Sequence, residues 1–101
     1  MSNDGDLLMS PAVRAVCVLL QQYDSLNDSI NTTKQIIERD YPDASTLGHQ
    51  MFKLDLEDYN EKAKQALQHL RLAYHGLSDA GKDSFVYVRR EMLQRLYIQL
   101  V

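Results

Sequence analysis

The chain has 101 residues, of which 45% are apolar and 25% charged, and its formal net charge is −3. This length and composition fit one globular domain with one modest core. The pattern has no basic stripe and the pI is about 5.5, which disfavours binding to nucleic acid or another polyanion.

The N-terminal region and the cysteine content indicate a compartment. Residues 1–6 are acidic, whereas a secretory signal begins with a basic region. The longest apolar run, residues 15–20, is far shorter than the ~20 residues that cross a bilayer. The single cysteine, Cys17, cannot form an internal disulfide, which favours a reducing environment. We therefore expect a cytoplasmic protein without a membrane span.

Residues 1–9 are polar and contain a glycine, so we expect a flexible N-terminus followed by one helical domain over residues 10–101. The first helix should span about 11–40, because Ser10-Pro11 is a favourable helix start and Tyr41-Pro42 a favourable end. Its middle, Asn27 to Thr33, is rich in poor helix formers, so the helix is either continuous there, kinked or divided. Apolar residues recur alternately four and three positions apart along it: Ala12, Val16, Leu19, Tyr23, Leu26, Ile30, Thr33 and Ile37.

A second helix over about 45–75 should follow a turn, with Asp43 or Ser45 as its N-cap and Gly76 at its end. It carries a heptad seam of the same spacing: Phe52, Leu56, Tyr59, Ala63, Ala66, Leu70, Ala73 and Leu77. The two seams match in one antiparallel register that sets Leu26 opposite Ala63 and centres on the turn. The pattern predicts a long antiparallel helical hairpin of coiled-coil type.

A third helix over about 79–100, capped by Ser78, should complete an all-α three-helix bundle. This helix is apolar on two sides, and a single hairpin can cover only one of them. We therefore expect an oligomer, either a homodimer or a complex with another protein, formed through residues 85–101. The residues predicted to line that partner interface are Phe85, Tyr87, Val88, Arg89, Met92, Tyr97 and Ile98.

Arg89 has two interpretations, because it falls inside the apolar arc of the third helix. Its stem could lie along apolar surface with the guanidinium in water, or it could be a paired arginine at an interface. Equal rise per residue in packed helices sets Arg89 level with Asp24. We predict that Arg89 is partly buried and pairs with Asp24 or Asp28 of the same chain or with an equivalent acid across an interface, and that Glu91 and Arg95 form a surface pair.

Nothing in the sequence predicts catalysis. No two of the histidines, His49, His69 and His75, have the spacing of two metal ligands on one helix face. Cys17 lies in an apolar run, which predicts a buried, inert thiol. There is no phosphate-binding glycine loop, nucleophile elbow or metalloprotease motif. We expect a non-enzymatic protein with no catalytic residues, no metal and no cofactor.

One acidic cluster lies in the second helix, at Asp55, Glu57, Asp58 and Glu61. Its ordinary interpretation is a solvated helix face, supported by Asp58 and Lys62 at a favourable spacing. The alternative is a docking surface for a basic partner.

The length, the central turn and the segment LRLAYHGLS (residues 70–78) resemble the small helical-hairpin proteins of the tryptophan-x-glycine type, which are secreted as dimers. Residues 87–91 (YVRRE) resemble that group's tyrosine-x-x-x-acid tail pattern. The chain has no tryptophan, and only Leu47-Gly48 stands near the place of the turn motif. The resemblance implies, as an alternative, a secreted partner protein.

The first hypothesis is a helical protein–protein interaction module, such as an adaptor, a chaperone-like partner or an inhibitor that covers another protein's surface. Tyrosine, methionine and arginine in the third helix give it an interface-like composition. A further alternative is a small nucleic-acid-associated regulator that uses this helix, although a helix-turn-helix reader would carry more basic charge.

Overall fold

A computed structural model describes residues 9–100 of the chain. Within this range there are four helices and no strand: α2 (Pro11–Asp40), α3 (Leu47–His75), α4 (Asp79–Val88) and α5 (Arg90–Arg95). The predicted all-α class is therefore confirmed. The flexible N-terminus that we expected over residues 1–9 lies outside the described residues, except for Met9.

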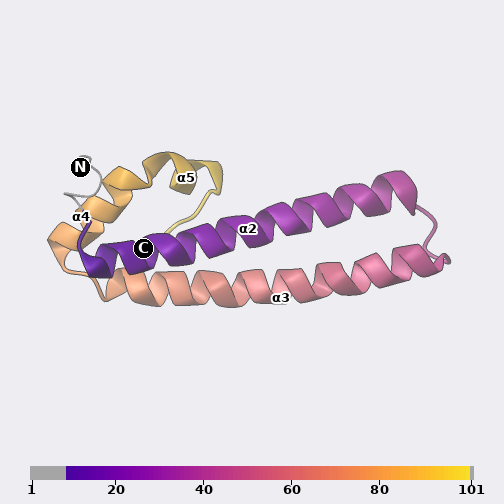
Figure 1. The fold of residues 1–101 in the computed structure, drawn as a ribbon, viewed down its shortest axis with the longest axis horizontal. Coiled ribbons are helices and arrows are strands. Elements are labelled where there is room, and N and C mark those ends of the chain that lie inside the picture. Colours follow the sequence, from indigo (N-terminus) through magenta and orange to yellow (C-terminus); the bar gives the residue numbers. More distant parts are fainter. Residues whose placement is uncertain (1–8, 101) are drawn as a thin grey trace.

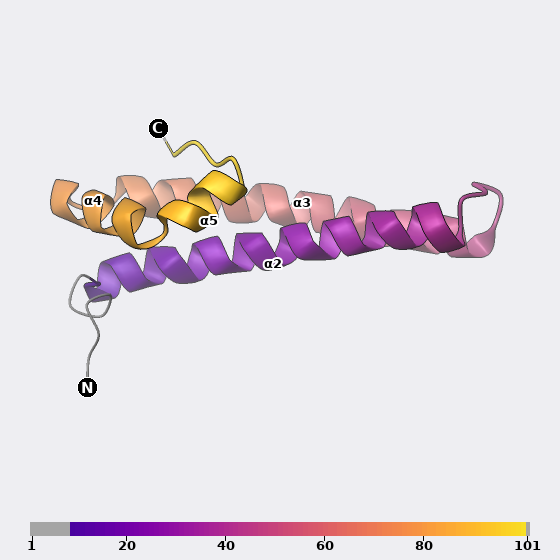
Figure 2. The same ribbon diagram turned by 90° about the horizontal axis from the view of Figure 1, so that it is seen from above.

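The long helices α2 and α3 lie side by side and antiparallel, as Figures 1 and 2 both show. The Cα radius of gyration is 17.0 Å, and the molecule measures 53 × 27 × 20 Å along its principal axes. A compact domain of this length would have a radius of gyration of about 13 Å. The hairpin is thus an elongated rod that exposes more surface than a compact bundle.

Helix α2 is continuous through its polar middle, where side chains bond the helix's own backbone. The Asn27 side chain donates to the Tyr23 carbonyl at 3.2 Å. The hydroxyls of Ser29 and Thr33 donate to the carbonyls four residues earlier at 3.2 and 2.7 Å. Such bonds satisfy the polar groups without leaving the helix. The helix also begins as expected, with the Ser10 hydroxyl accepting from the Val13 N–H at 3.3 Å.

The turn between α2 and α3 differs from the prediction in its capping residue. Asp43 accepts hydrogen bonds from the backbone N–H and the hydroxyl of Ser45, at 2.9 and 2.8 Å. Those bonds lower the pKa of Asp43, with a smaller effect from the charge of His49. Because both predicted caps are used within the turn, Thr46 is the N-cap, and its hydroxyl accepts from the His49 N–H at 3.2 Å.

The seam residues lie between the two helices with one exception. All eight predicted seam residues of α3, and seven of the eight in α2, are buried or half-buried. Ala12 is exposed, and its neighbour Val13 is fully buried instead. The reason is that the start of α2 contacts both α3 and α4, so its buried face widens to include Val13, Cys17 and Leu20.

The core lies at one end of the rod, where α4 covers the start of α2. Phe85 is fully buried there, with its ring centroid 5.9 Å from that of Tyr74. In Figure 2, α4 and α5 reach along only part of the hairpin, and the rest, out to the 41–46 turn, is two helices alone. No helix in residues 9–100 has the length and apolar character needed to cross a membrane.

Candidate functional site

The third predicted helix is bent at Arg89 and ends early. Arg89 has φ −112° and ψ 19°, which separates α4 from α5, and α5 ends at Arg95 rather than near residue 100. Phe85 and Leu93 are both buried, although eight residues in a straight helix would set them about 80° apart around its axis. The bend at Arg89 lets both side chains face the core.

Helix α5 ends in a Schellman motif with a tyrosine in the place where glycine is usual. The N–H of Ile98 donates to the Leu93 carbonyl, and that of Tyr97 to the Gln94 carbonyl, both at 3.2 Å. Tyr97 has φ 54°, the left-handed conformation of this motif's C′ position. Leu93 and Ile98 both pack in the core cluster, the apolar contact that accompanies this motif.

The segment after α5 folds back onto the hairpin. The Gln99 carbonyl accepts a hydrogen bond from Nε of Arg71 in α3, at 3.2 Å. Leu100 is buried in the core cluster. Residues 96–100 therefore form one wall of a surface feature that a straight third helix would not have produced.

That feature is an open groove of about 670 Å³ between α4, α5, the end of α3 and residues 96–100. Its walls are mainly apolar and include Tyr74, Val86, Arg90, Leu93, Tyr97 and Leu100. Arg90 is the only charged residue that lines it within the described part of the chain. We call these residues the α4–α5 groove.

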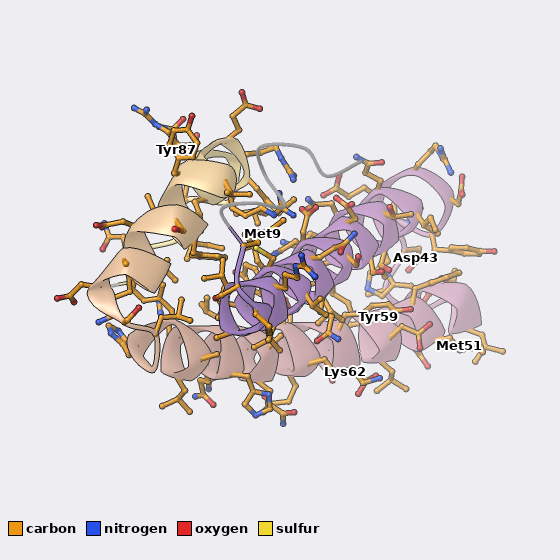
Figure 3. All side chains as sticks on the ribbon, turned by 60° about the vertical axis from the view of Figure 1, so that its left-hand side comes forward. Met9, Asp43, Met51, Tyr59, Lys62 and Tyr87 are labelled. Atoms are coloured by element: carbon orange, nitrogen blue, oxygen red, sulfur yellow. The ribbon has the colours of Figure 1, made fainter. Side chains whose placement is uncertain are left out.

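The structure places the predicted interface residues in three environments. Phe85 is 0% exposed, so its side chain belongs to the core and offers no surface to a partner in this conformation. Val88, Arg89, Met92 and Ile98 are half-buried. Tyr87 is 74% exposed and Tyr97 91% exposed. In Figure 3, Tyr87 projects from α4 away from the hairpin.

Of the nine residues that line the groove, only Tyr97 and Ile98 belong to the predicted partner interface. Val86 and Arg90 line the groove with Tyr97, and their spacing of four and seven residues would place all three on one face of a straight helix. The fold-back of residues 96–100 completes the groove and depends on the contact between Arg71 and Gln99, two residues far apart in sequence. The sequence signal for Val86, Arg90 and Tyr97 is therefore the helix face that their spacing gives them.

The prediction that Arg89 pairs with Asp24 or Asp28 of the same chain is wrong. Arg95 Nη2 lies 3.0 Å from Asp24 Oδ1, whereas within residues 9–100 no carboxylate lies within ion-pair distance of Arg89. The contact is an ion pair and not an aligned hydrogen bond, because that buried oxygen has no hydrogen-bond donor within the same residues. The bend at Arg89 carries Arg95 over α2, and among the described residues Arg95 pairs with Asp24 and not with the expected partner Glu91, although both lie in α5.

Arg89 is half-buried, as predicted, and lies near Cys17. Burial raises the pKa of the Cys17 thiol, and the charge and hydrogen bonding of Arg89 partly oppose this. The sulfur of Met9 lies 3.8 Å from that of Cys17. The thiol is thus buried beside Met9 and the bend at Arg89, in line with the interpretation of Cys17 as a core residue.

The other candidate residues stay apart. His49 bonds the Tyr41 carbonyl through Nδ1 at 2.7 Å, and His69 and His75 are exposed. No three His, Cys, Asp or Glu side chains in residues 9–100 are placed to hold a metal ion together. Within the acidic cluster, Asp58 forms the expected pair with Lys62 at 2.9 Å.

Comparison with family models, with curated proteins and with solved structures finds no match to this chain in any of the three. The resemblance to the tryptophan-x-glycine proteins therefore receives no support from relatives. The properties of the α4–α5 groove are the evidence on function.

Proposed function

We propose that this protein is a non-enzymatic interaction module that binds another protein through the α4–α5 groove and the exposed tyrosine beside it. The observation that carries the proposal is Tyr97. Its side chain is 91% exposed, and its backbone has the left-handed conformation that costs a residue with a Cβ roughly 1–2 kcal/mol. Glycine would suit the fold better. A strained, exposed aromatic side chain beside a groove is typical of a binding site.

The groove defines the chemistry of its partner. Apolar and aromatic walls favour an amphipathic helix or an extended segment that inserts apolar side chains. Arg90 is exposed and has no ion-pair partner within residues 9–100, so it is available to a carboxylate next to that apolar segment. The preferred partner is a protein segment that presents apolar side chains beside an acid.

The charge of this surface favours a protein over nucleic acid. Arg95 is already paired with Asp24, and Arg89 is half-buried near Cys17. One free arginine supplies little of the phosphate neutralisation on which nucleic-acid affinity depends. We propose a cytoplasmic protein, an adaptor, chaperone-like partner or inhibitor, that acts by covering its partner's surface.

The test is quantitative capture of partners from extracts of the native host, comparing the wild type with Tyr97→Gly and Arg90→Glu. The matched control is Leu72→Ser, which changes another exposed apolar residue, on α3. We expect both groove variants to lose the same captured proteins and the control to keep them. Tyr97→Gly removes no buried side chain, so this variant should fold like the wild type and its capture can be compared directly. Identical capture by the wild type and the three variants would refute the proposed surface.

A further inference from the structure

A second exposed apolar surface lies on α3, on the side away from the hairpin seam. Leu47, Met51 and Leu54 are 70, 58 and 66% exposed. Their spacing of four and three residues sets them on one line along the helix. In Figure 3, Met51 projects outward from α3 and away from α2. We call these three residues the α3 stripe.

The charge beside the α3 stripe is opposite in sign to the charge around the α4–α5 groove. Residues 51–64 carry four acids (Asp55, Glu57, Asp58 and Glu61) and three bases (Lys53, Lys62 and Lys64), a formal charge of −1, and Asp58 is paired with Lys62. Residues 85–100 carry three arginines (Arg89, Arg90 and Arg95) and one acid (Glu91), a formal charge of +2. Segments of opposite charge attract, and this attraction also fixes their relative orientation.

The two surfaces are at opposite ends of the molecule. The α3 stripe lies next to the 41–46 turn, and α4 and α5 lie at the other end of a rod 53 Å long (Figures 1 and 2). They therefore do not meet within one chain, and contact between them requires two copies.

We propose that the α3 stripe of one copy occupies the α4–α5 groove of a second copy. The inference deepens the proposed function and rests on it, because it names an occupant for the groove. The stripe is an amphipathic helix surface with acids beside it, the chemistry that the apolar groove walls and Arg90 favour. The acidic side chain that could meet Arg90 is Asp55, beside Leu54, because Asp58 is already paired with Lys62.

Such an interface is heterologous, since the two copies use different surfaces. Each pair still has one unused groove and one unused stripe, so the assembly grows head to tail unless a ring closes. About two turns of helix make a small interface, which gives weak, concentration-dependent association. The opposite charges predict that added salt weakens it.

The test is sedimentation velocity of the full chain at increasing concentration. For the wild type we expect the weight-average mass to rise continuously above the 11.6 kDa of one chain, and to fall again with salt. Leu54→Glu blocks the stripe and Arg90→Glu blocks the groove, and each change should weaken self-association by about tenfold or more. Controls of matched chemistry are Leu72→Glu for the apolar change and Lys34→Glu for the charge reversal, both at exposed positions.

Mixing the two blocked variants gives the decisive result. Each supplies the surface that the other lacks, so the mixture should form one-to-one dimers and stop there. A symmetric dimer through α4 and α5 would instead leave Leu54→Glu associated and give no rescue on mixing, which would overturn the inference. A wild type that stays monomeric at every concentration would also overturn it. The proposed function is tested separately by the capture experiment. If self-association is absent but Tyr97→Gly still fails to capture the host proteins that the wild type captures, the proposed function stands and only the self-association is refuted.

Discussion

Replacing Tyr97 with glycine should stabilise the protein. The left-handed backbone at φ 54° costs a residue with a Cβ roughly 1–2 kcal/mol, and glycine avoids that cost. Glycine also loses more backbone entropy on folding, which offsets about 0.5–1 kcal/mol of the gain. Little burial is lost, because the tyrosine side chain is 91% exposed. The net gain in free energy of unfolding should be about 0.75 kcal/mol, the difference between the midpoints of these two ranges.

Thermal unfolding followed by circular dichroism would detect this gain as a rise in Tm of about 2–8 °C for a domain of this size. The control is Tyr97→Ala, which removes the same aromatic ring but keeps a Cβ and therefore the strained backbone. Alanine should be no more stable than the wild type. If alanine and glycine were equally stable, or if glycine lowered the Tm, Tyr97 would not be strained and the main support for the proposed function would be lost.

Three further substitutions test the packing at two glycines and one ion pair. Gly48→Ala should lower the free energy of unfolding by about 1 kcal/mol in urea denaturation, because its Cβ would stand 2.4 Å from the Tyr41 ring and overpacking outweighs the gain in helix propensity. Gly76→Ala, whose Cβ would meet nothing closer than 3.5 Å at a helical φ of −76°, should be neutral or slightly stabilising. Arg95→Ala should lower the Tm at low salt, because it leaves the buried Asp24 oxygen without its cation, and the loss should shrink as salt is added. A loss that does not depend on salt would instead assign Arg95 a packing role.

The sequence predicts the hairpin well because one physical requirement, an apolar seam, repeats along both of its helices. Local signals also suffice where the interaction is local: Ser10 and Ser78 each accept a hydrogen bond from the N–H three residues later. The continuity of α2 was left open, since propensity alone does not count the side-chain bonds that Asn27 and Thr33 make to the backbone.

The third helix was harder to predict because its form depends on contacts with distant residues. A wheel drawn for a straight helix sets Phe85 among the interface residues and pairs Arg89 with Asp24. The bend instead buries Phe85 against Tyr74 and brings Arg95 to Asp24. The α3 stripe was missed for a different reason: its spacing is visible in the sequence, but it runs beside a longer seam that already accounts for an amphipathic helix.

The two exposed surfaces share a physical property that sets them apart from the rest of the chain. Their exposed side chains, Tyr97 and the α3 stripe, do not lower the free energy of the isolated monomer, unlike the buried groove residues Leu93 and Leu100. Glycine would suit the backbone at 97 better. Polar residues at 47, 51 and 54 would leave the hairpin seam intact, since that seam is formed by Phe52, Leu56 and their successors. Residues that do not stabilise the fold of one chain have two explanations: neutral variation, or contact with another molecule. Neutral variation gives no reason for the surface at one end of the rod to be apolar and basic while the other is apolar and acidic. A contact between copies does, because complementary ends are what a head-to-tail interface requires.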